Sequence, residues 1–355
     1  MKILLIGGSG FIGRFVVRDL IAAGHNVAVY HRGRSTGELP KGAHEIIGDR
    51  SQLGWKRMDF VRVRPDVVID CILSSGVQAK GVMDVFRGVT PHLVVLSSQD
   101  VYRAYRILLG LETGALQPVP ITEDSDLRSH LRPFGADHLK RLRGIFNWID
   151  DEYEKIEVER AVADDPELPA TILRLPMVYG PGDPLHRLYP VVKRIDDNRP
   201  AILLEEGLAR CGLPRGYVEN VAAAIALAAT SDRARGRTYN VADPPFSELE
   251  WTRQIGVAAG WNGEVIAIAR EETPEHLRQP YNLAQDWTVS GDRIRAELGF
   301  TEPVGIPDAL RRTIEWERAN PPSGLAPTTF DYPAEDAAIQ LHARGLEALR
   351  RRIEY

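Results

Sequence analysis

Residues 2–34 have the sequence KILLIGGSGFIGRFVVRDLIAAGHNVAVYHRGR. The segment begins with a short apolar run, Lys2–Ile6, which leads directly into a glycine-rich turn. Apolar residues then recur at helical spacing as far as Gly24, a helix stop signal, and a second apolar run covers 27–30. This order predicts a strand, a turn, a helix and a second strand. The chain therefore opens with a βαβ unit.

The turn has the sequence Gly7-Gly8-Ser9-Gly10-Phe11-Ile12-Gly13, which fits both a G-x-G-x-x-G and a G-x-x-G-x-x-G spacing. Glycines in such a turn have separate functions: one allows the sharp turn, one lets the backbone approach a pyrophosphate, and one lets the helix lie close to the sheet. The N–H groups and the dipole of the helix N-terminus favour the phosphates. Between a strand and a helix, this turn indicates a dinucleotide-binding site rather than a purely structural turn. The predicted contacts are Gly7, Gly10, Phe11, Ile12 and Gly13.

The end of the second predicted strand indicates which dinucleotide binds. An NAD site usually has an acidic residue there for the ribose 2′-hydroxyl, whereas this chain has Tyr30-His31-Arg32-Gly33-Arg34. Two guanidinium groups suit a 2′-phosphate. Arg32 and Arg34 therefore favour NADP over NAD; the alternative is that both are solvated loop charges.

Composition limits the partners. The chain has 355 residues, enough for a dinucleotide domain and a smaller lobe. Its 49 acidic and 44 basic residues give a net charge of −5, which favours a small-molecule substrate over nucleic acid or a membrane surface. Cys71 and Cys211 have no metal or redox spacing, no apolar stretch reaches the roughly 20 residues of a membrane span, and no signal peptide precedes the first strand. We therefore expect a cytoplasmic protein with no metal site.

Four further apolar segments predict strands: Ala43–Asp49, Pro65–Cys71, His92–Ser98 and Pro169–Leu175. Their nearly continuous apolar runs are typical of strands covered on both faces, as in a parallel sheet, and helical segments lie between them. We predict an α/β fold with a doubly wound parallel sheet of the Rossmann type. It has at least six strands, with the first strand in a central position.

The same pattern predicts two domains. Residues 1–175 form the dinucleotide-binding domain, and 103–148, where prolines and charges break the pattern, form an insertion that is either a lid over the ligand face or a peripheral decoration. Residues 176–355 form mainly a substrate-binding lobe. It ends in an amphipathic helix over 334–355, which either packs on its own domain or mediates a homodimer.

Taken together, the motifs resemble the extended short-chain dehydrogenase/reductase superfamily, which includes nucleotide-sugar epimerases and dehydratases. The resemblance covers residues 1–316 and rests on the glycine turn, Gly48-Asp49-Arg50, SSQDVY at 97–102 and LPMVYGPGD at 175–183. It implies a Rossmann fold with a nicotinamide cofactor, a contact of Asp49 with the adenine amino group, and a catalytic hydroxyl at Ser98, whose alternative is a satisfied loop hydroxyl. The other cofactor contacts implied by the resemblance are Arg50, Ser97, Lys155, Leu175, Pro176 and Met177.

The family's Tyr-x-x-x-Lys motif, on the helix before the sixth strand, is altered in this chain. A four-residue step puts a phenol and an ammonium on one helix face, where the cation lowers the pKa of the phenol. Residues 150–162 are DDEYEKIEVERAV, in which no tyrosine stands four residues before a lysine. If Tyr153 holds the tyrosine position, Glu157 holds the lysine position. If Lys155 holds the lysine position, Asp151 holds the tyrosine position.

We favour the register based on Lys155, because the residues after it look like the family's stretch after its lysine. Asp151 then faces the same way as Lys155, and Tyr153 replaces it only if the helix begins after residue 153. The predicted catalytic residues are therefore Ser98, Lys155 and either Tyr153 or Asp151.

The substrate is less well indicated. Nucleotide-sugar enzymes of the superfamily usually have Asn where this chain has Met177, although Arg215 before Gly216-Tyr217-Val218 resembles their phosphate-binding arginine. We predict an NADP-dependent epimerase, dehydratase or reductase acting on a sugar nucleotide or another small hydroxy or carbonyl compound, with Arg215 as a substrate contact. The alternative is a redox-silent NADP-binding sensor or scaffold. RNA binding, as in the atypical chloroplast branch, is disfavoured by the net charge.

Overall fold

The main body of the protein is a seven-stranded parallel sheet with the order β10-β6-β5-β4-β1-β2-β3. The computed structural model describes residues 1–33, 39–324 and 327–353. Because β1 lies between β4 and β2, the predicted doubly wound sheet with a central first strand is confirmed. The strands are β1 (Lys2–Ile6), β2 (Asn26–His31), β3 (His44–Ile47), β4 (Val67–Asp70), β5 (Leu93–Ser98), β6 (Ala170–Leu175) and β10 (Thr238–Asn240).

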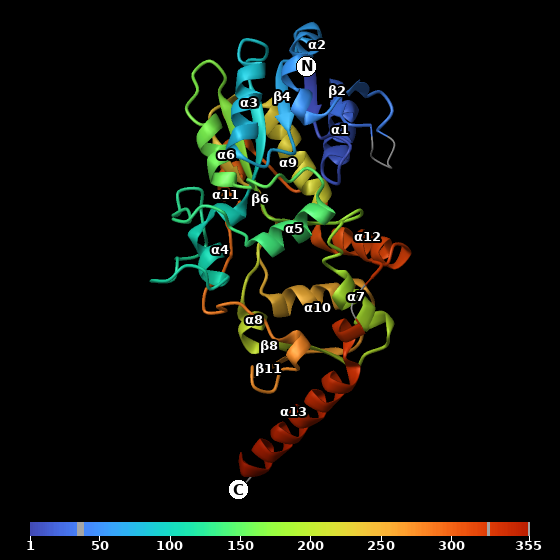
Figure 1. Cartoon of the computed structure of the whole chain (residues 1–355). Coiled ribbons are helices and arrows are strands. Elements are labelled where there is room, and N and C mark those ends of the chain that lie inside the picture. Colours follow the sequence, from blue (N-terminus) through green and yellow to red (C-terminus); the bar gives the residue numbers. More distant parts are fainter. Residues whose placement is uncertain (34–38, 325–326, 354–355) are drawn as a thin grey trace.

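The strands are apolar along their length because helices cover both faces of the sheet (Figure 1). Ile3 and Leu5 of β1 belong to a hydrophobic core shared with α1 (Gly13–Ala22) and α9 (Val218–Thr230). Leu4 and Ile6 point the other way, into a core shared with α3 (Gly76–Phe86) and α6 (Lys155–Val162). All four side chains are fully buried.

A second lobe lies below the sheet in Figure 1 and contains two small parallel sheets. One pairs β8 (Ala201–Glu205) with β11 (Glu264–Ile268), and the other pairs β7 (Met177–Tyr179) with β9 (Arg215–Tyr217). After residue 175 the chain does not stay in this lobe, since α9 and β10 return to the main body. The remaining helices are α2 (Arg57–Val63), α4 (Arg103–Leu108), α5 (Ala136–Ile145), α7 (Tyr189–Asp196), α8 (Glu206–Arg210), α10 (Glu248–Ala258), α11 (Asp292–Leu298) and α12 (Ile306–Ala319).

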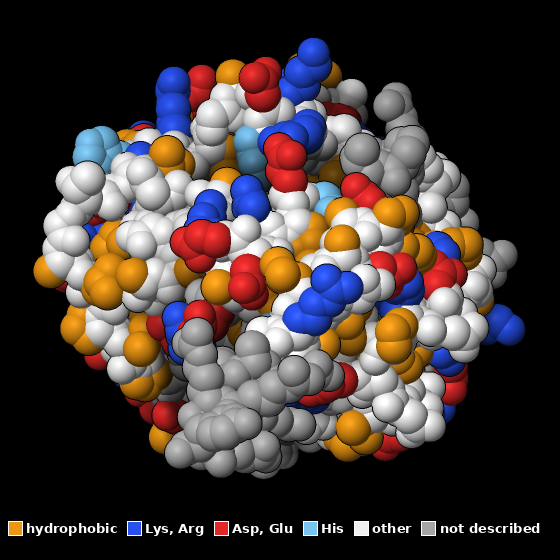
Figure 2. Space-filling view, turned by 90° about the horizontal axis from the view of Figure 1, so that it is seen from below, with side chains coloured by type: hydrophobic (Ala, Val, Ile, Leu, Met, Phe, Trp, Pro, Cys, Tyr) orange, Lys and Arg blue, Asp and Glu red, His pale blue; other side chains and the backbone are white. Residues whose placement is uncertain are grey.

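The chain ends in α13 (Tyr332–Ile353), which confirms the predicted C-terminal helix as far as Ile353. Its first turn is fixed by Glu335, a fully buried carboxylate that accepts a 2.5 Å hydrogen bond from Arg194. The rest of α13 extends away from the body (Figure 1). The side chains that give the predicted helix its amphipathic end, Leu346, Leu349 and Ile353, lie outside the described ones. Basic and acidic side chains are interspersed on the face in Figure 2.

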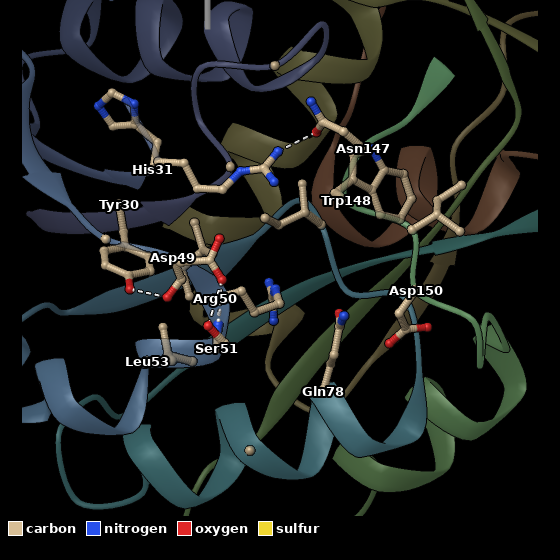
Figure 3. A pocket seen from close by; sticks show the side chains of 18 of the residues that line it. Tyr30, His31, Asp49, Arg50, Ser51, Leu53, Gln78, Asn147, Trp148 and Asp150 are labelled. Atoms are coloured by element: carbon tan, nitrogen blue, oxygen red, sulfur yellow. Dashed lines mark hydrogen bonds between the residues drawn. The ribbon is translucent and has the colours of Figure 1, made fainter. Parts of the chain in front are cut away.

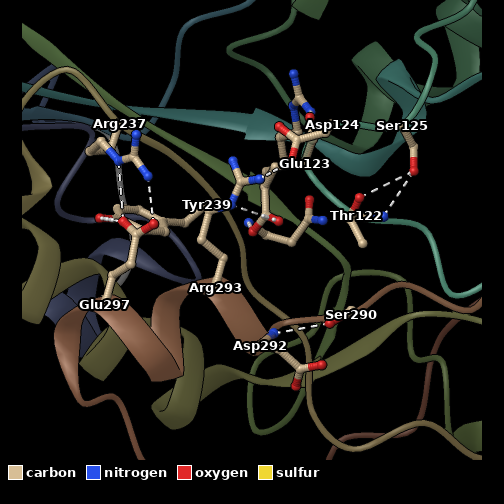
Figure 4. A network of polar contacts seen from close by, with 12 residues as sticks. Thr122, Glu123, Asp124, Ser125, Arg237, Tyr239, Ser290, Asp292, Arg293 and Glu297 are labelled. Atoms are coloured by element: carbon tan, nitrogen blue, oxygen red, sulfur yellow. Dashed lines mark hydrogen bonds and ion pairs between the residues drawn. The ribbon is translucent and has the colours of Figure 1, made fainter.

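The insertion, residues 103–148, is packed between the two lobes. The backbone of Ile121 exchanges hydrogen bonds of 2.8 Å with Thr288 and Ser290, and Arg293 forms ion pairs with Glu123 and Asp124 (Figure 4). Segments more than 160 residues apart in the sequence are thereby held together. The insertion is therefore part of the packed structure.

Candidate active site

The glycine turn forms one wall of a cavity at the C-terminal end of β1. Gly7 has a φ of +84°, a left-handed conformation that allows the chain to leave the strand sharply. A Cβ at Gly13 would lie 2.5 Å from the carbonyl oxygen of Gly7, so only glycine lets α1 approach the turn so closely. Gly10 lines the cavity, and its nearest neighbour for a Cβ is 3.6 Å away. Its backbone is thus open to a ligand, as the predicted glycine functions require.

The cavity has a volume of about 800 Å³, within the range of roughly 300–1,000 Å³ for small-molecule sites. It runs along the C-terminal ends of β1, β2 and β4, beside α3, and reaches the end of the insertion (Figure 3). Of the predicted cofactor residues, Gly7, Gly10, Arg32, Asp49 and Arg50 line it. The other lining residues are Ile6, Ser9, Tyr30, His31, Gly48, Ser51, Leu53, Gly54, Ile72, Val77, Gln78, Gly81, Asp84, Val85, Arg143, Asn147, Trp148, Ile149 and Asp150.

Tyr30 and Asp49 shape the end of the cavity next to β2. The Tyr30 hydroxyl donates a 2.6 Å hydrogen bond to the carbonyl oxygen of Asp49, and a Cβ at Gly48 would lie within 2.6 Å of the Tyr30 ring. The Asp49 carboxylate caps the short helix η1 (Arg50–Gln52) by accepting from the backbone and the hydroxyl of Ser51 at 3.0 and 2.8 Å. Asp49 is therefore held at the position that the resemblance gives to an adenine contact.

Arg50 brings a positive charge to the cavity. It is anchored by Asp70, a fully buried residue at the end of β4, whose two carboxylate oxygens accept from Nη2 at 2.5 and 2.6 Å. The Nε and Nη1 atoms of Arg50 are also buried and have no hydrogen-bond partner within the described part of the chain. Such nitrogens are costly to bury unpaired, and the guanidinium places a positive charge beside the cavity that suits an anionic ligand.

Arg32 spans the cavity from the end of β2. Its guanidinium donates a 2.5 Å hydrogen bond to Oδ1 of Asn147, at the far end of the insertion (Figure 3). The second arginine of the predicted 2′-phosphate site, Arg34, lies outside the described residues. Arg32 is thus near the nucleotide cavity in a ligand-competent position, but it is already paired within the protein.

The register favoured from the sequence for Asp151 is wrong. The helix α6 begins at Lys155, with Glu154 as its N-cap, so residues 151–153 belong to the preceding turn. The Asp151 side chain is 76% exposed and forms an ion pair with Arg143. Tyr153, in contrast, is buried and turns inward, as the sequence allowed if the helix began late. The late start of α6 has a non-local cause, because its N-cap Glu154 is held by a buried ion pair with Arg128 of the insertion.

Tyr153 and Ser98 meet at Asp100, a residue that was not predicted for the site. The Tyr153 hydroxyl donates a 2.9 Å hydrogen bond to Oδ2 of Asp100, and Ser98 Oγ accepts from the backbone N–H of Asp100 at 3.2 Å. Burial, and secondly the charge of Asp100, raise the pKa of Tyr153 well above its usual value. Burial also raises the pKa of Asp100, against the opposing effect of Arg128.

Lys155 is buried and bridges two strand ends. Its ammonium donates to the carbonyl oxygens of Leu73, after β4, and Leu96, in β5, at 2.5 and 2.9 Å. The ring of Trp148 lies over the ammonium, with its centroid 5.2 Å from Nζ. Burial lowers the pKa of Lys155 to about 8. Trp148 lines the cavity, whereas Lys155, Tyr153 and Ser98 are not among its described lining residues.

Ser97, Leu175, Pro176 and Met177 do not line the cavity either. Ser97 is buried and donates a 2.5 Å hydrogen bond to Glu159, which also binds Arg174, so its hydroxyl serves a structural network. Leu175 pairs with Ser98 across β6 and β5, which places 175–177 beside the catalytic candidates. Phe11 and Ile12 are half-buried at the start of α1.

The side chain of Arg215 is also paired within the protein. It forms an ion pair with Glu248, and its guanidinium carbon lies 4.7 Å from the centroid of the Trp251 ring. Both charged side chains are 13% exposed. Arg215 pairs with Met177 across β9 and β7. The residue that favours a nucleotide-sugar substrate, Arg215, therefore lies next to the residue that disfavours it, Met177. Binding a phosphate through Arg215 would require its pair with Glu248 to open.

Sequence reasoning missed Asp70, Asp100, Asn147 and Trp148. The one local signal was Asp100 inside the SSQDVY motif, a charged residue next to a predicted catalytic hydroxyl. Across the described ranges, no helix is long and apolar enough to cross a membrane, and no group of three or more potential ligand side chains could hold a metal ion. Both cysteines carry free thiols, Cys211 buried and Cys71 half-buried.

Comparison with known proteins gives a consistent result. The model of the NAD dependent epimerase/dehydratase family matches residues 3–140 and 152–242. A 2′-dehydrokanamycin reductase of Streptomyces kanamyceticus is 27% identical over 290 residues, which are 80% of this chain and 74% of that protein. The chloroplast stem-loop binding protein of 41 kDa b of Arabidopsis thaliana is 24% identical over 73% of this chain, but the match spans only 63% of its length.

Solved structures share the fold. A UDP-glucose 4-epimerase of Thermus thermophilus in complex with NAD has a TM-score of 0.57 and 21% identity, over 90% of this chain and 100% of that one. A UDP-glucose 4-epimerase of Thermotoga maritima with UDP-glucose has a TM-score of 0.60 and 17% identity, over 90% and 99%. The residues 141–151 that the family model skips include Asn147 and Trp148 of the cavity.

Proposed function

The chain belongs to the NAD dependent epimerase/dehydratase family, and on that premise we propose that it is an NADP-dependent oxidoreductase or epimerase that interconverts a hydroxyl and a carbonyl group of a small polar substrate. The observation that carries the proposal is the convergence of Ser98, Tyr153 and Lys155 at the C-terminal ends of β4 and β5, next to the nucleotide cavity. A phenol, a hydroxyl and a cation so placed can bind and protonate the oxygen of a reacting carbonyl.

Three features support NADP as the cofactor. The backbone at Gly10 is open to a pyrophosphate, the Arg50 side chain brings a positive charge to the cavity wall, and Arg32 lies at the end of β2 where a 2′-phosphate would be bound. When bound, the nicotinamide ring donates or accepts a hydride. The protein's own contribution is to hold the substrate oxygen near Ser98 and Tyr153, and to limit access of water with half-buried aromatic residues such as Phe134, which packs on Tyr153.

For the substrate, we propose a sugar-like hydroxy or carbonyl compound. The relative from Streptomyces kanamyceticus is named as a reductase of 2′-dehydrokanamycin, which supports carbonyl reduction. A nucleotide sugar is less well supported, because Arg215 is engaged by Glu248. The alternative, a redox-silent NADP-binding protein, is favoured by one observation: the ring of Trp148 covers Lys155 on the side of the cavity.

The experiment combines binding with turnover. NADPH, NADP and NAD are titrated into the protein, and sugar nucleotides, keto sugars and simple carbonyl compounds are then screened by the absorbance of reduced nicotinamide and by product chromatography. Tyr153→Phe should lower turnover by about a hundredfold to ten-thousandfold with cofactor affinity intact, whereas Asp151→Asn, a change at an exposed carboxylate, should not. Full turnover by Tyr153→Phe would refute the proposal, and tight NADPH binding with no turnover on any compound would favour the redox-silent alternative.

A further inference from the structure

Asp100 is an unusual neighbour for a catalytic tyrosine. It lies in the short helix η3 (Gln99–Val101), directly after Ser98, and is only 5% exposed. One carboxylate oxygen, Oδ2, accepts the Tyr153 hydroxyl at 2.9 Å. The other, Oδ1, is buried and has no hydrogen-bond partner within the described residues. Burying a carboxylate oxygen without a hydrogen-bond partner costs free energy, because the oxygen loses its hydration. A buried group that is kept at this cost calls for an explanation such as a functional role.

The surrounding cations do not neutralise the Asp100 carboxylate directly. Arg128 donates through Nε to the backbone carbonyl of Asp100 at 3.0 Å, and its two terminal nitrogens are used by Glu154 and the carbonyl of His130. Lys155 uses its ammonium on two carbonyl oxygens. Among the described residues, the Asp100 carboxylate is therefore bonded to the Tyr153 hydroxyl, with the Ser98 side chain also close to it, and not to a cation.

We propose that Asp100 is the proton-accepting partner of Tyr153, a positioning residue that acts on the substrate only through the phenol. This inference rests on the proposed function, since it gives Tyr153 the proton-transfer step. The carboxylate fixes the direction of the phenol hydroxyl and provides a second place for its proton, one hydrogen bond away from the phenol oxygen.

The step balances in both directions. In oxidation, the substrate O–H bond breaks and its proton goes to the Tyr153 oxygen, while the original phenol proton goes to Oδ2 of Asp100; the hydride leaves the substrate carbon for oxidised nicotinamide. In reduction, the proton on Oδ2 returns to Tyr153, the phenol proton goes to the carbonyl oxygen, and the hydride comes from reduced nicotinamide. Tyr153 is neutral before and after each turnover, so no tyrosinate has to persist beside a carboxylate.

Burial raises the pKa of Asp100, and burial with the Asp100 charge raises the pKa of Tyr153, both in the direction that this exchange requires. A carboxyl that is easier to protonate can hold the proton, and a phenol that resists ionisation does not lose it to solvent. The titratable and charged groups that face the pair are Tyr105 from α4, Arg128 from the insertion with its partner Glu154, and Lys155 at the start of α6.

The test uses Asp100→Asn, which keeps a hydrogen-bond acceptor for the phenol but cannot take its proton. We expect reduction by the wild type to slow as the pH rises through the pKa of the pair, because Asp100 must be protonated. In Asp100→Asn this pH-dependent limb should disappear, and turnover should fall by about a hundredfold or more with NADPH affinity unchanged. Asp100→Glu should keep the limb. Asp126→Asn, at an exposed carboxylate of the insertion, is the matched control.

A second measurement needs no substrate. The tyrosinate absorbance of Tyr153 is isolated by subtracting Tyr153→Phe from wild type, and Asp100→Asn/Tyr153→Phe from Asp100→Asn. Removing the carboxylate charge should lower the pH at which Tyr153 ionises by about one unit or more. An unchanged ionisation of Tyr153, or an Asp100→Asn variant that keeps the wild-type pH limb, would overturn the inference. Absence of all turnover in the wild type would instead refute the proposed function, while this titration still decides the coupling.

Discussion

Replacing Arg32 with alanine should weaken NADP binding and leave NAD binding almost unchanged. A charge-assisted hydrogen bond to a phosphate is worth about 1.5–3 kcal/mol, but Arg32 must first give up its 2.5 Å bond to Asn147, worth about 0.5–1.5 kcal/mol. The net loss is therefore within about 0–2.5 kcal/mol, with a midpoint of about 1.3 kcal/mol that corresponds to about an eightfold loss of affinity. Calorimetric titration of wild type and Arg32→Ala with NADP and NAD measures it directly.

Asn147 provides the matched variant for this prediction. Asn147→Ala removes the competing acceptor and frees Arg32, so NADP should bind about twofold to tenfold more tightly, with NAD unaffected. The double variant should behave like Arg32→Ala, because Asn147 is expected to act on the 2′-phosphate only through Arg32. An equal loss of NADP and NAD affinity in Arg32→Ala would show that Arg32 does not bind the 2′-phosphate of NADP. Tighter NAD binding by Asn147→Ala would show that the contact restricts the cavity in general.

Three further predictions concern stability. Gly13→Ala places a Cβ 2.5 Å from a backbone oxygen of the glycine turn and should lower the free energy of unfolding in urea by about 1–3 kcal/mol. Gly144 lies in the helix α5, and a Cβ added there has no neighbouring atom within 4 Å, so Gly144→Ala should raise the free energy of unfolding by up to about 1 kcal/mol. Arg128→Met removes the cation that is paired with the buried Glu154 and should lower the free energy of unfolding by about 3–5 kcal/mol. Arg132→Met breaks an ion pair in which Arg132 is 72% and Glu152 60% exposed, and should lower it by no more than about 1 kcal/mol in the same assay. Burial lowers the pKa of Lys155 from 10.5 to about 8, so at pH values between these two the unfolded chain binds more protons than the folded chain. The unfolding free energy of the wild type, compared with that of Lys155→Met, should therefore rise by about 3 kcal/mol as the pH increases from about 8 to 10.5. A difference between the two proteins that does not change with pH would contradict this.

The sheet was predictable because its signals are local. Apolar runs such as Lys2–Ile6 are continuous since alternate side chains enter cores on opposite faces. Within the turn, Gly7 is required by its left-handed φ and Gly13 by its close contact with the Gly7 carbonyl oxygen. The parallel order then follows from the alternation of strands and helices. Asp49 and Arg50, which also line the cavity, were predicted from the family resemblance.

The inner part of the site was not predictable, because its geometry depends on contacts across the chain. Asp70 and Arg50 meet only once β4 is placed beside β1, and Tyr153 reaches Asp100 across 53 positions of sequence. The start of α6 depends on Arg128, which holds the N-cap Glu154 from within the insertion. Helical periodicity alone extends the helix back to residue 151, and this extension turned Asp151 inward and Tyr153 outward in the favoured register.

The altered position of the tyrosine changes its chemistry as well as its geometry. In a Tyr-x-x-x-Lys arrangement the nearby cation lowers the pKa of the phenol and favours its use as a base. Here the ammonium of Lys155 is bound by two carbonyl oxygens, and the phenol of Tyr153 donates to a carboxylate. Burial and that charge raise the pKa of Tyr153, so the phenol is protonated at neutral pH. In reduction the phenol donates its proton to the carbonyl oxygen and takes one back from a protonated Asp100, whereas oxidation of an alcohol needs an ionised Asp100 to receive the displaced proton. We therefore expect the rate of reduction to fall and the rate of oxidation to rise as the pH increases and Asp100 loses its proton.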